Sequence, residues 1–330
     1  MSRNSELAAA TLGHLTGLGI SQFVICAGAR NAPLVTSLLA AGTGLGLKVW
    51  HHFDERAAAF FALGLSKAED GPVAVLTTSG TAAAELLPAA IESYYTGIPL
   101  VLVTADRPEC YRGSGAPQAI EQRGLFGIYA PLSIDVQNCE DLSWAARWDR
   151  KSPLHLNICL EEPRADDQVD DFKVVNMPEP ESKNYDELPR RLTEFVRVYP
   201  DAVCLLGALP LNWRRAVREF LKQSGLAFWA EATSGLRECD DLKAQQVVRE
   251  TGIASIEVGA VLRIGGVPSL RFWRELESRR GVDVLSISPY PFAGLARRSD
   301  LIVSSYFPPE IEVASQKREV DPGTSQLEAA

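Results

Sequence analysis

The chain has 330 residues, enough for two domains of ordinary size. Hydrophobic residues make up 46% and charged residues 23%, which is typical of a folded globular protein and excludes a largely disordered chain. The net charge of -9 and the lack of a stripe of Lys and Arg argue against nucleic-acid binding, because such binding needs a basic surface facing the phosphates.

In the first half of the chain, short apolar runs alternate with helix-length segments. Strands that are apolar on both faces are typical of a parallel sheet covered by helices on both sides, so we predict an α/β fold. The predicted strands are 23–26, 47–51, 72–77, 99–105 and 154–160. The predicted helices are 54–68, with Asp54 as N-cap, and 79–97, ending at Gly97.

After Val175 this pattern stops, and the prolines and mixed charges of 176–191 predict a linker. Further apolar runs alternating with helical stretches then predict a second, smaller α/β domain of Rossmann-like type. Its predicted strands are 201–207, 226–232, 259–266, 282–288 and 300–305, and its predicted helices include 211–225 and 269–281. We therefore expect domains at 1–178 and 188–315, followed by a loosely held tail at 316–330.

The six cysteines are far apart and include no Cys-x-x-Cys pair. Several lie in apolar, strand-like contexts, such as Cys26 in FVICAG and Cys159 in LNICLE, so we predict buried, reduced thiols and no metal ligands in this chain. No apolar run approaches the ~18 residues of a membrane span, and residues 1–20 lack the apolar core of a signal peptide. These features predict a cytoplasmic protein without membrane insertion.

Polar side chains follow the first four predicted strands, in the segments 27–33, 52–56, 78–81 and 104–108. In a parallel sheet the carboxyl ends of the strands meet at one edge, where ligands bind, so these segments should form one rim. Two arginines there, Arg30 and Arg107, lie among hydroxyl and amide groups and would suit a small molecule that carries a carboxylate.

Each rim residue also has an ordinary structural explanation. Gly28 and Gly80 lie outside Gly-x-Gly-x-x-Gly and P-loop patterns and can be turn formers. Glu55 follows a capping Asp and can compensate the helix dipole. Asp106 and Arg107 can form a surface ion pair. The location of all of them on one rim favours a functional interpretation.

Four blocks of the sequence carry a resemblance to a known family. They are CAGARNAPLV, HHFDERAAAFFALGLSKAEDGPVAVLTTSGTAAAELLPAAIE, GIPLVLVTADRPECYRGSGAPQAIEQRGLFG and SPLHLNICLEEP. From about Ala8 to Pro163 the chain resembles the N-terminal region of 2-succinyl-5-enolpyruvyl-6-hydroxy-3-cyclohexene-1-carboxylate synthase, the thiamine-diphosphate enzyme of menaquinone biosynthesis. The second half resembles the family's middle domain in its α/β pattern and length.

This resemblance implies that the first domain is a pyrimidine-binding domain and that Glu55 is the catalytic carboxylate. Its hydrogen bond to the pyrimidine ring nitrogen would promote removal of the C2 proton of the thiazolium. The implied cofactor-binding residues are Glu55, Thr78, Ser79, Gly80 and Thr81. The residues implied to bind isochorismate and the succinyl-bearing intermediate are Arg30, Asn31, Arg107 and Gln118. The implied reaction joins the succinyl unit of decarboxylated 2-oxoglutarate to isochorismate.

The chain departs from the family pattern in several places. The family's P-G-S-R-S block is A-G-A-R-N here, with Ala29 and Asn31 at the serine positions, and Pro117 replaces an asparagine. No G-D-G block followed by an asparagine is present to hold Mg²⁺ and the diphosphate, and Glu69–Gly71 lies in the wrong domain for this role. Thiamine diphosphate and Mg²⁺ are therefore expected to need a partner domain.

Three interpretations remain open. The chain works with a separate diphosphate-domain chain in a homo- or hetero-oligomer, or it is a fragment of such a synthase, or it is a non-catalytic binding or regulatory relative. The presence of Glu55 favours the first two, because a protein that only binds does not need a carboxylate there. Ala29 and Pro117 favour the third.

Overall fold

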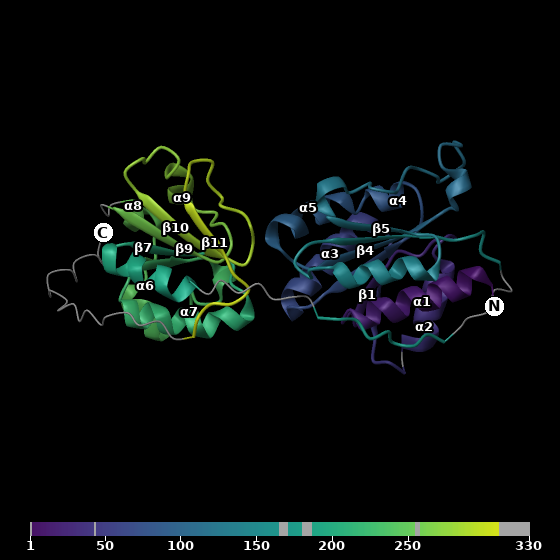
Figure 1. Ribbon diagram of the computed structural model, residues 1–330, viewed down its shortest axis with the longest axis horizontal. Helices are drawn as coiled ribbons and strands as arrows, with labels where there is room; N and C mark the ends of the chain where they lie inside the picture. Colours follow the sequence, from purple (N-terminus) through teal and green to yellow (C-terminus); the bar gives the residue numbers. More distant parts are fainter. Residues whose placement is uncertain (1, 43, 165–170, 180–186, 255–257, 310–330) are drawn as a thin grey trace. The chain divides into compact units, whose positions relative to one another are not determined.

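The computed structural model describes residues 2–42, 44–164, 171–179, 187–254 and 258–309. The chain divides into two compact units, Met1–Glu181 and Ser182–Ala330 (Figure 1). Each unit contains a parallel sheet with helices, which confirms the predicted α/β class. The predicted tail, 316–330, and part of the predicted linker, 180–186, lie outside the described residues.

The described part of the N-terminal unit contains a six-stranded parallel sheet in the order β2-β1-β3-β4-β6-β5. Its strands are β1 (Gln22–Ile25), β2 (Lys48–His51), β3 (Val73–Thr77), β4 (Leu100–Asp106), β5 (Leu132–Val136) and β6 (Leu154–Cys159). In the register of this sheet Thr77 is opposite Thr104, and Asp106 is opposite Cys159. The carboxyl ends of β3, β4 and β6 therefore lie side by side.

Two hydrophobic cores enclose this sheet because its strands are apolar on both faces. Phe23 and Ile25 pack into one core, whereas Val24 packs into the other. The first core is covered by α1 (Arg3–Gly17), α2 (Ala32–Gly42) and the 3-10 helix η3 (Cys139–Arg147). The second is covered by α3 (Glu55–Glu69) and α5 (Leu87–Thr96), and Figure 1 shows α1 and α2 lying together away from α5. Shorter helices of this unit are α4 (Thr81–Ala84), η1 (Glu109–Tyr111) and η2 (Gly127–Tyr129).

Three features of this unit differ from the sequence-based predictions. The helix predicted at 79–97 is divided into α4 and α5, because Pro88 cannot donate a backbone hydrogen bond to the preceding turn. The strand predicted at 47–51 is largely exposed as β2, because it lies at the sheet edge. Strand β5 was not predicted, since an edge strand that alternates polar and apolar residues lacks a continuous apolar run.

The described part of the C-terminal unit contains a five-stranded parallel sheet in the order β11-β10-β9-β7-β8. Its elements are α6 (Leu188–Val198), β7 (Val203–Leu206), α7 (Leu211–Ser224), β8 (Phe228–Ala230), η4 (Ala232–Ser234), η5 (Asp240–Gln245), α8 (Glu250–Ala254), β9 (Ala260–Ile264), α9 (Arg271–Glu275), β10 (Asp283–Ser288) and β11 (Asp300–Val303). The helix predicted at 269–281 is shorter than expected, because after Glu275 the backbone continues in turns closed by bonds such as Ser278 N–H to the Glu275 carbonyl. Within the described residues, every helix is too short or too polar to cross a membrane.

Candidate functional site

The rim predicted from the sequence forms at the carboxyl edge of the N-terminal sheet. The turns after β1, β3 and β4 follow three neighbouring strands, so their residues lie close together. The segment that starts at Leu160 after β6 joins them, because β6 lies beside β4. No sequence pattern predicted that this last segment belongs to the rim.

Asn31 shapes the turn after β1. Its side chain is fully buried, its Oδ1 accepts a hydrogen bond from the Gly28 N–H at 2.8 Å, and its Nδ2 donates to the Cys26 carbonyl at 2.9 Å. A buried amide that is satisfied by backbone groups at both ends stabilises a local structure. Asn31 therefore holds the turn that carries Arg30, and its contact with a substrate stays a prediction.

The turn of residues 78–81 packs tightly against two other rim segments. A Cβ atom on Gly28 would lie 2.6 Å from the Cβ of Thr78, and one on Gly80 would lie 3.1 Å from the Cα of Gln118. Gly80 also has φ 83°, a conformation that favours glycine. The turn is thus fixed beside the exposed Gln118, while Ser79 is buried in it.

Gly80→Ala is expected to destabilise the N-terminal unit by about 2 kcal/mol, because alanine at this backbone conformation is strained and its Cβ meets the Gln118 backbone. Thermal unfolding of the full chain measures this change. The matched control is Gly64→Ala, since Gly64 lies in α3 with no heavy atom within 4 Å of its Cβ position, and alanine there should stabilise by ~0.5–1 kcal/mol. Equal effects of the two substitutions would contradict this account of the turn.

A buried hydrogen-bond network connects this turn to β4 and β6. The Oε1 of Gln122 accepts from the Gly80 N–H at 2.7 Å, and its Nε2 donates to the Oδ1 of Asn157 at 2.9 Å. The Nδ2 of Asn157 in turn donates to Asp106 and to Asp135, at 2.9 Å each. Gln122 and Asn157 are both fully buried, so the network stabilises the position of the turn from inside the protein.

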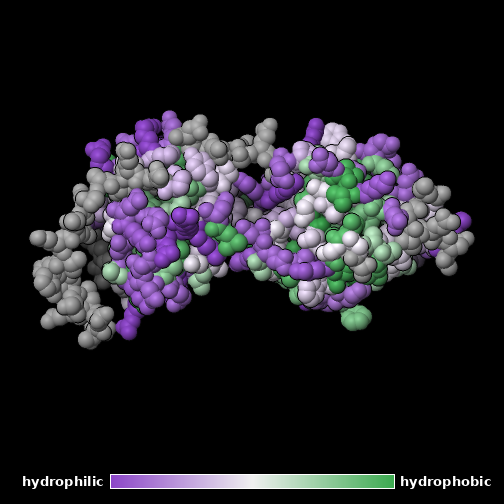
Figure 2. Space-filling view, turned by 90° about the horizontal axis from the view of Figure 1, so that it is seen from below, coloured by the Kyte–Doolittle hydropathy of each residue, from purple (hydrophilic) through white to green (hydrophobic). Residues whose placement is uncertain are grey.

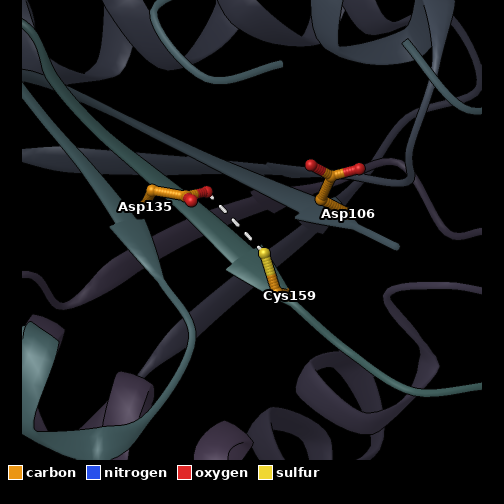
Figure 3. Close-up of side chains that lie close together, drawn as sticks. All are labelled: Asp106, Asp135 and Cys159. Carbon is orange, nitrogen blue, oxygen red and sulfur yellow. Dashed lines mark hydrogen bonds between the residues drawn. The ribbon is translucent and has the colours of Figure 1, made fainter. Parts of the chain in front are cut away.

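Asp106, Asp135 and Cys159 lie together at the ends of β4, β5 and β6 (Figure 3), with their potential ligand atoms within 4.8 Å of one another. The Arg112 guanidinium occupies this group: it donates to both Asp135 oxygens at 2.9 and 2.7 Å and lies 3.6 Å from Asp106 and 3.3 Å from the Cys159 sulfur. Burial, reinforced by Asp135, raises the pKa of Cys159 to about 12, so the thiol stays neutral. A site with a guanidinium and a neutral thiol does not suit Mg²⁺, which prefers oxygen ligands.

The alternative explanation of Asp106 and Arg107 as a surface ion pair is wrong. Asp106 is 2% exposed, and its Oδ1 accepts from the backbone N–H of Arg107 at 2.8 Å, while its ion pair is with Arg112. Burial raises the pKa of Asp106 despite this hydrogen bond. Asp106 therefore fixes the backbone from which the Arg107 side chain extends.

Arg30 and Arg107 come together around one carboxylate. The Nη2 of Arg30 donates to Oε2 of Glu162, and Nη1 of Arg107 lies 3.8 Å from the same oxygen. The Arg30 side chain is 6% exposed and the Arg107 side chain 19%, whereas the Glu162 side chain is 72% exposed. Both arginines thus pair with a carboxylate, the group that their guanidinium groups suit, and their contact with a substrate stays a prediction. Glu162 is a residue of this cluster that no sequence pattern predicted.

Glu55 lies at the start of α3 with a half-buried side chain. The Oδ1 of Asp54 accepts from the Ala57 N–H at 2.6 Å, so Asp54 caps the helix as predicted. Burial and then the Glu55 carboxylate raise the pKa of Cys26, after β1, to about 12. Among the residues that the structure describes, none makes a hydrogen bond or ion pair with the Glu55 carboxylate. A carboxyl group at the edge of the rim that pairs with none of the described residues is free to bind a ligand, and its contact with a ring nitrogen stays a prediction.

Residues 5–125 match the family described as thiamine pyrophosphate enzyme, N-terminal TPP binding domain. The match lies within the N-terminal unit. The matched stretch includes the predicted site residues Arg30, Glu55, the turn 78–81, Arg107 and Gln118. Of the buried hydrogen-bond network, Gly80, Asp106 and Gln122 lie within the match, whereas Asp135 and Asn157 lie beyond it.

The chain is also similar to 2-succinyl-5-enolpyruvyl-6-hydroxy-3-cyclohexene-1-carboxylate synthases. It is 40% identical to that of Bdellovibrio bacteriovorus in an alignment of 314 residues that covers 89% of this chain and 57% of the relative. It is 43% identical to that of Akkermansia muciniphila in an alignment of 289 residues that covers 86% of this chain and 53% of the relative. The chain thus spans about half the length of the curated relatives it matches. These matches confirm the resemblance seen in the motifs and extend it into the C-terminal unit.

Proposed function

We propose that this chain supplies the pyrimidine-binding and middle domains of a thiamine-diphosphate-dependent transferase. The proposed reaction joins the succinyl unit from decarboxylated 2-oxoglutarate to isochorismate, in menaquinone biosynthesis. The observation that carries this proposal is the Glu55 carboxylate, which pairs with none of the described residues, on the same rim as Arg30 and Arg107. The similarity to synthases named for this product supports it.

When bound, thiamine diphosphate supplies the carbon centre at which a 2-oxo acid loses CO₂. In the proposed site, Glu55 holds a proton at a pyrimidine ring nitrogen and so promotes proton removal from that carbon centre. Thr78, Ser79, Gly80 and Thr81 line the cofactor side of the rim. Their turn is held rigidly by the hydrogen bond of Gln122, which keeps the rim in place when a ligand binds.

Substrate binding is assigned to the other side of the rim. Arg30 and Arg107 bind carboxylates, and the exposed Gln118 offers an amide beside them. Asn31 contributes by holding the turn that carries Arg30, in addition to any contact of its own. Both proposed substrates carry carboxylates, which suits a rim with two guanidinium groups.

Mg²⁺ and the diphosphate are proposed to bind to a partner domain in a homo- or hetero-oligomer. Arg112 already occupies the acidic group on this rim, and the sequence has no G-D-G block. Figure 2 shows hydrophobic residues gathered on one face of the N-terminal unit. The exposed apolar side chains of the N-terminal unit include Leu39, Leu45, Trp50, Phe53 and Phe60. Phe53 lies two residues before Glu55 in the chain. Such surface near a site is typical of an interface.

A cytoplasmic location is part of this proposal. All six cysteines are free thiols, which is typical of a reducing compartment. Cell fractionation with detection of the chain tests it, and recovery in a secreted fraction would contradict it.

The proposal is tested by titrating thiamine diphosphate and Mg²⁺ into the full chain, alone and together with a diphosphate-domain chain taken from a related synthase. We expect weak or no binding by the chain alone, because Arg112 already pairs with the carboxylates of Asp135 and Asp106 on the rim. Calorimetry of the mixture should show Mg²⁺-dependent binding, and light scattering should show a complex. Submicromolar, Mg²⁺-dependent binding by the chain alone would contradict the need for a partner domain. A monomer that never gains binding would instead favour a non-catalytic relative.

A further inference from the structure

Glu162 occupies the position that a substrate carboxylate would take between the two rim arginines. It follows β6, 132 residues after Arg30 in the chain. One of its oxygens, Oε2, contacts both Arg30 and Arg107. A substrate carboxylate bound at the proposed site would form the same bridge between the two guanidinium groups.

We propose that Glu162 is an internal competitor of substrate carboxylates for Arg30 and Arg107. An anionic substrate must displace Glu162 in order to bind, so Glu162 lowers the affinity for such a substrate. This inference rests on the proposed function of the rim, since it takes Arg30 and Arg107 to be the carboxylate-binding groups. A substrate carboxylate replaces Glu162 on the arginines, and Glu162 moves into the solvent.

The two guanidinium groups keep their positions without Glu162. Arg30 Nη1 donates to the Leu160 carbonyl at 3.2 Å. Arg107 Nε and Nη2 donate to the Pro117 carbonyl at 3.1 and 2.9 Å, and its guanidinium lies over the Tyr111 ring at 5.4 Å. Backbone carbonyls therefore orient both arginines, so loss of Glu162 leaves both guanidinium groups in position.

Glu162 can leave at low cost because its side chain is 72% exposed. An exposed carboxylate is well hydrated and contributes little to stability through its ion pair. The almost fully buried Arg30, in contrast, gains from any anion that reaches it, because its charge is poorly solvated. With Glu162 in place the three side chains carry one net positive charge, and without it they carry two.

The test measures the binding of succinate, a simple dicarboxylate, to the full chain and to Glu162→Gln at fixed ionic strength. The side-chain Nε–H signals of Arg30 and Arg107 in ¹⁵N-arginine-labelled protein report binding directly. We expect Glu162→Gln to lower the dissociation constant by about 3- to 10-fold, because glutamine keeps the size of the side chain but neither neutralises the arginines nor repels the ligand.

The matched control is Glu161→Gln. Glu161 is the neighbouring exposed acid, and it pairs with Arg3 at 3.1 Å instead of with the rim arginines. Its substitution removes the same charge from the same segment and should leave the dissociation constant unchanged. Thermal unfolding of both variants establishes that they fold.

The direction of the change in the succinate dissociation constant distinguishes a competing carboxylate from a residue that only positions the arginines. If Glu162→Gln binds succinate more weakly than, or as strongly as, the unmodified chain while Arg107→Ala loses binding, the competitor proposal is overturned and the substrate role of the arginines remains. If Arg107→Ala binds succinate unchanged, the proposed substrate role of Arg107 fails. If no variant binds succinate, the competitor proposal also fails, since two arginines held in position without a paired carboxylate should bind it.

Discussion

Glu55→Gln is expected to slow exchange of the thiamine C2 proton by about 10²- to 10⁴-fold in the complex with a diphosphate-domain chain. Glutamine keeps the length of the side chain and can still form a hydrogen bond, but it cannot donate or accept the proton at the pyrimidine nitrogen. Exchange is followed by NMR after quenching in acid. The expected loss corresponds to ~3–5 kcal/mol, which exceeds the ~0.3–1 kcal/mol effect of one acidic residue on a helix dipole.

Asp54→Asn is the matched control for this experiment. It removes one negative charge from the same helix start, and asparagine still accepts the Ala57 N–H bond that caps α3. The helix-dipole explanation of Glu55 predicts similar effects of the two substitutions on exchange. The proposed proton-transfer role predicts a large effect for Glu55→Gln alone, and exchange at the unmodified rate in Glu55→Gln would show that the assignment is wrong.

Arg112→Met is expected to destabilise the N-terminal unit by about 3 kcal/mol at pH 7, because it leaves Asp135 and Asp106 without a compensating charge. Methionine keeps much of the side-chain volume, so the loss is mainly electrostatic. Calorimetric unfolding that resolves the two units measures it. In the control, Lys48→Met removes an exposed ion pair with Glu69 from the same unit and should cost less than ~1 kcal/mol.

The loss of unfolding free energy caused by Arg112→Met should become smaller as the pH falls from 7 to below the ordinary aspartate pKa of 3.8. Burial alone would raise the pKa of Asp135, but hydrogen bonds from Arg112, Asn157 and Gln137 outweigh burial and lower it. A carboxyl group whose pKa is lowered by folding contributes stability above its unfolded pKa, and this contribution is lost as the pH falls through its folded pKa. The Arg112→Met variant lacks most of this contribution. At low pH, protonation of Asp135 and Asp106 also removes the negative charges that the variant leaves unpaired. A deficit that is constant with pH would contradict the electrostatic explanation.

The strands of both sheets could be predicted from sequence where they are buried on both faces. Runs such as those of β3 and β4 are continuously apolar because helices cover both sides of them. The same rule failed at the edges of the N-terminal sheet: it missed β5 and predicted too much burial for β2. An edge strand meets solvent along one side, so its pattern depends on neighbours that the local sequence does not reveal.

The sequence by itself determined the α/β class and the chemical groups of the rim, because parallel strands bring their carboxyl ends to one edge whatever else the chain does. Only the tertiary structure decided what each rim residue does. Asn31 turns inward to the backbone, and Glu162 reaches Arg30 from the segment that follows β6. Gln122 and Asn157, which form a hydrogen bond in the buried network, are 35 residues apart in the chain. Contacts of this kind depend on strand order and register, and no local periodicity encodes them.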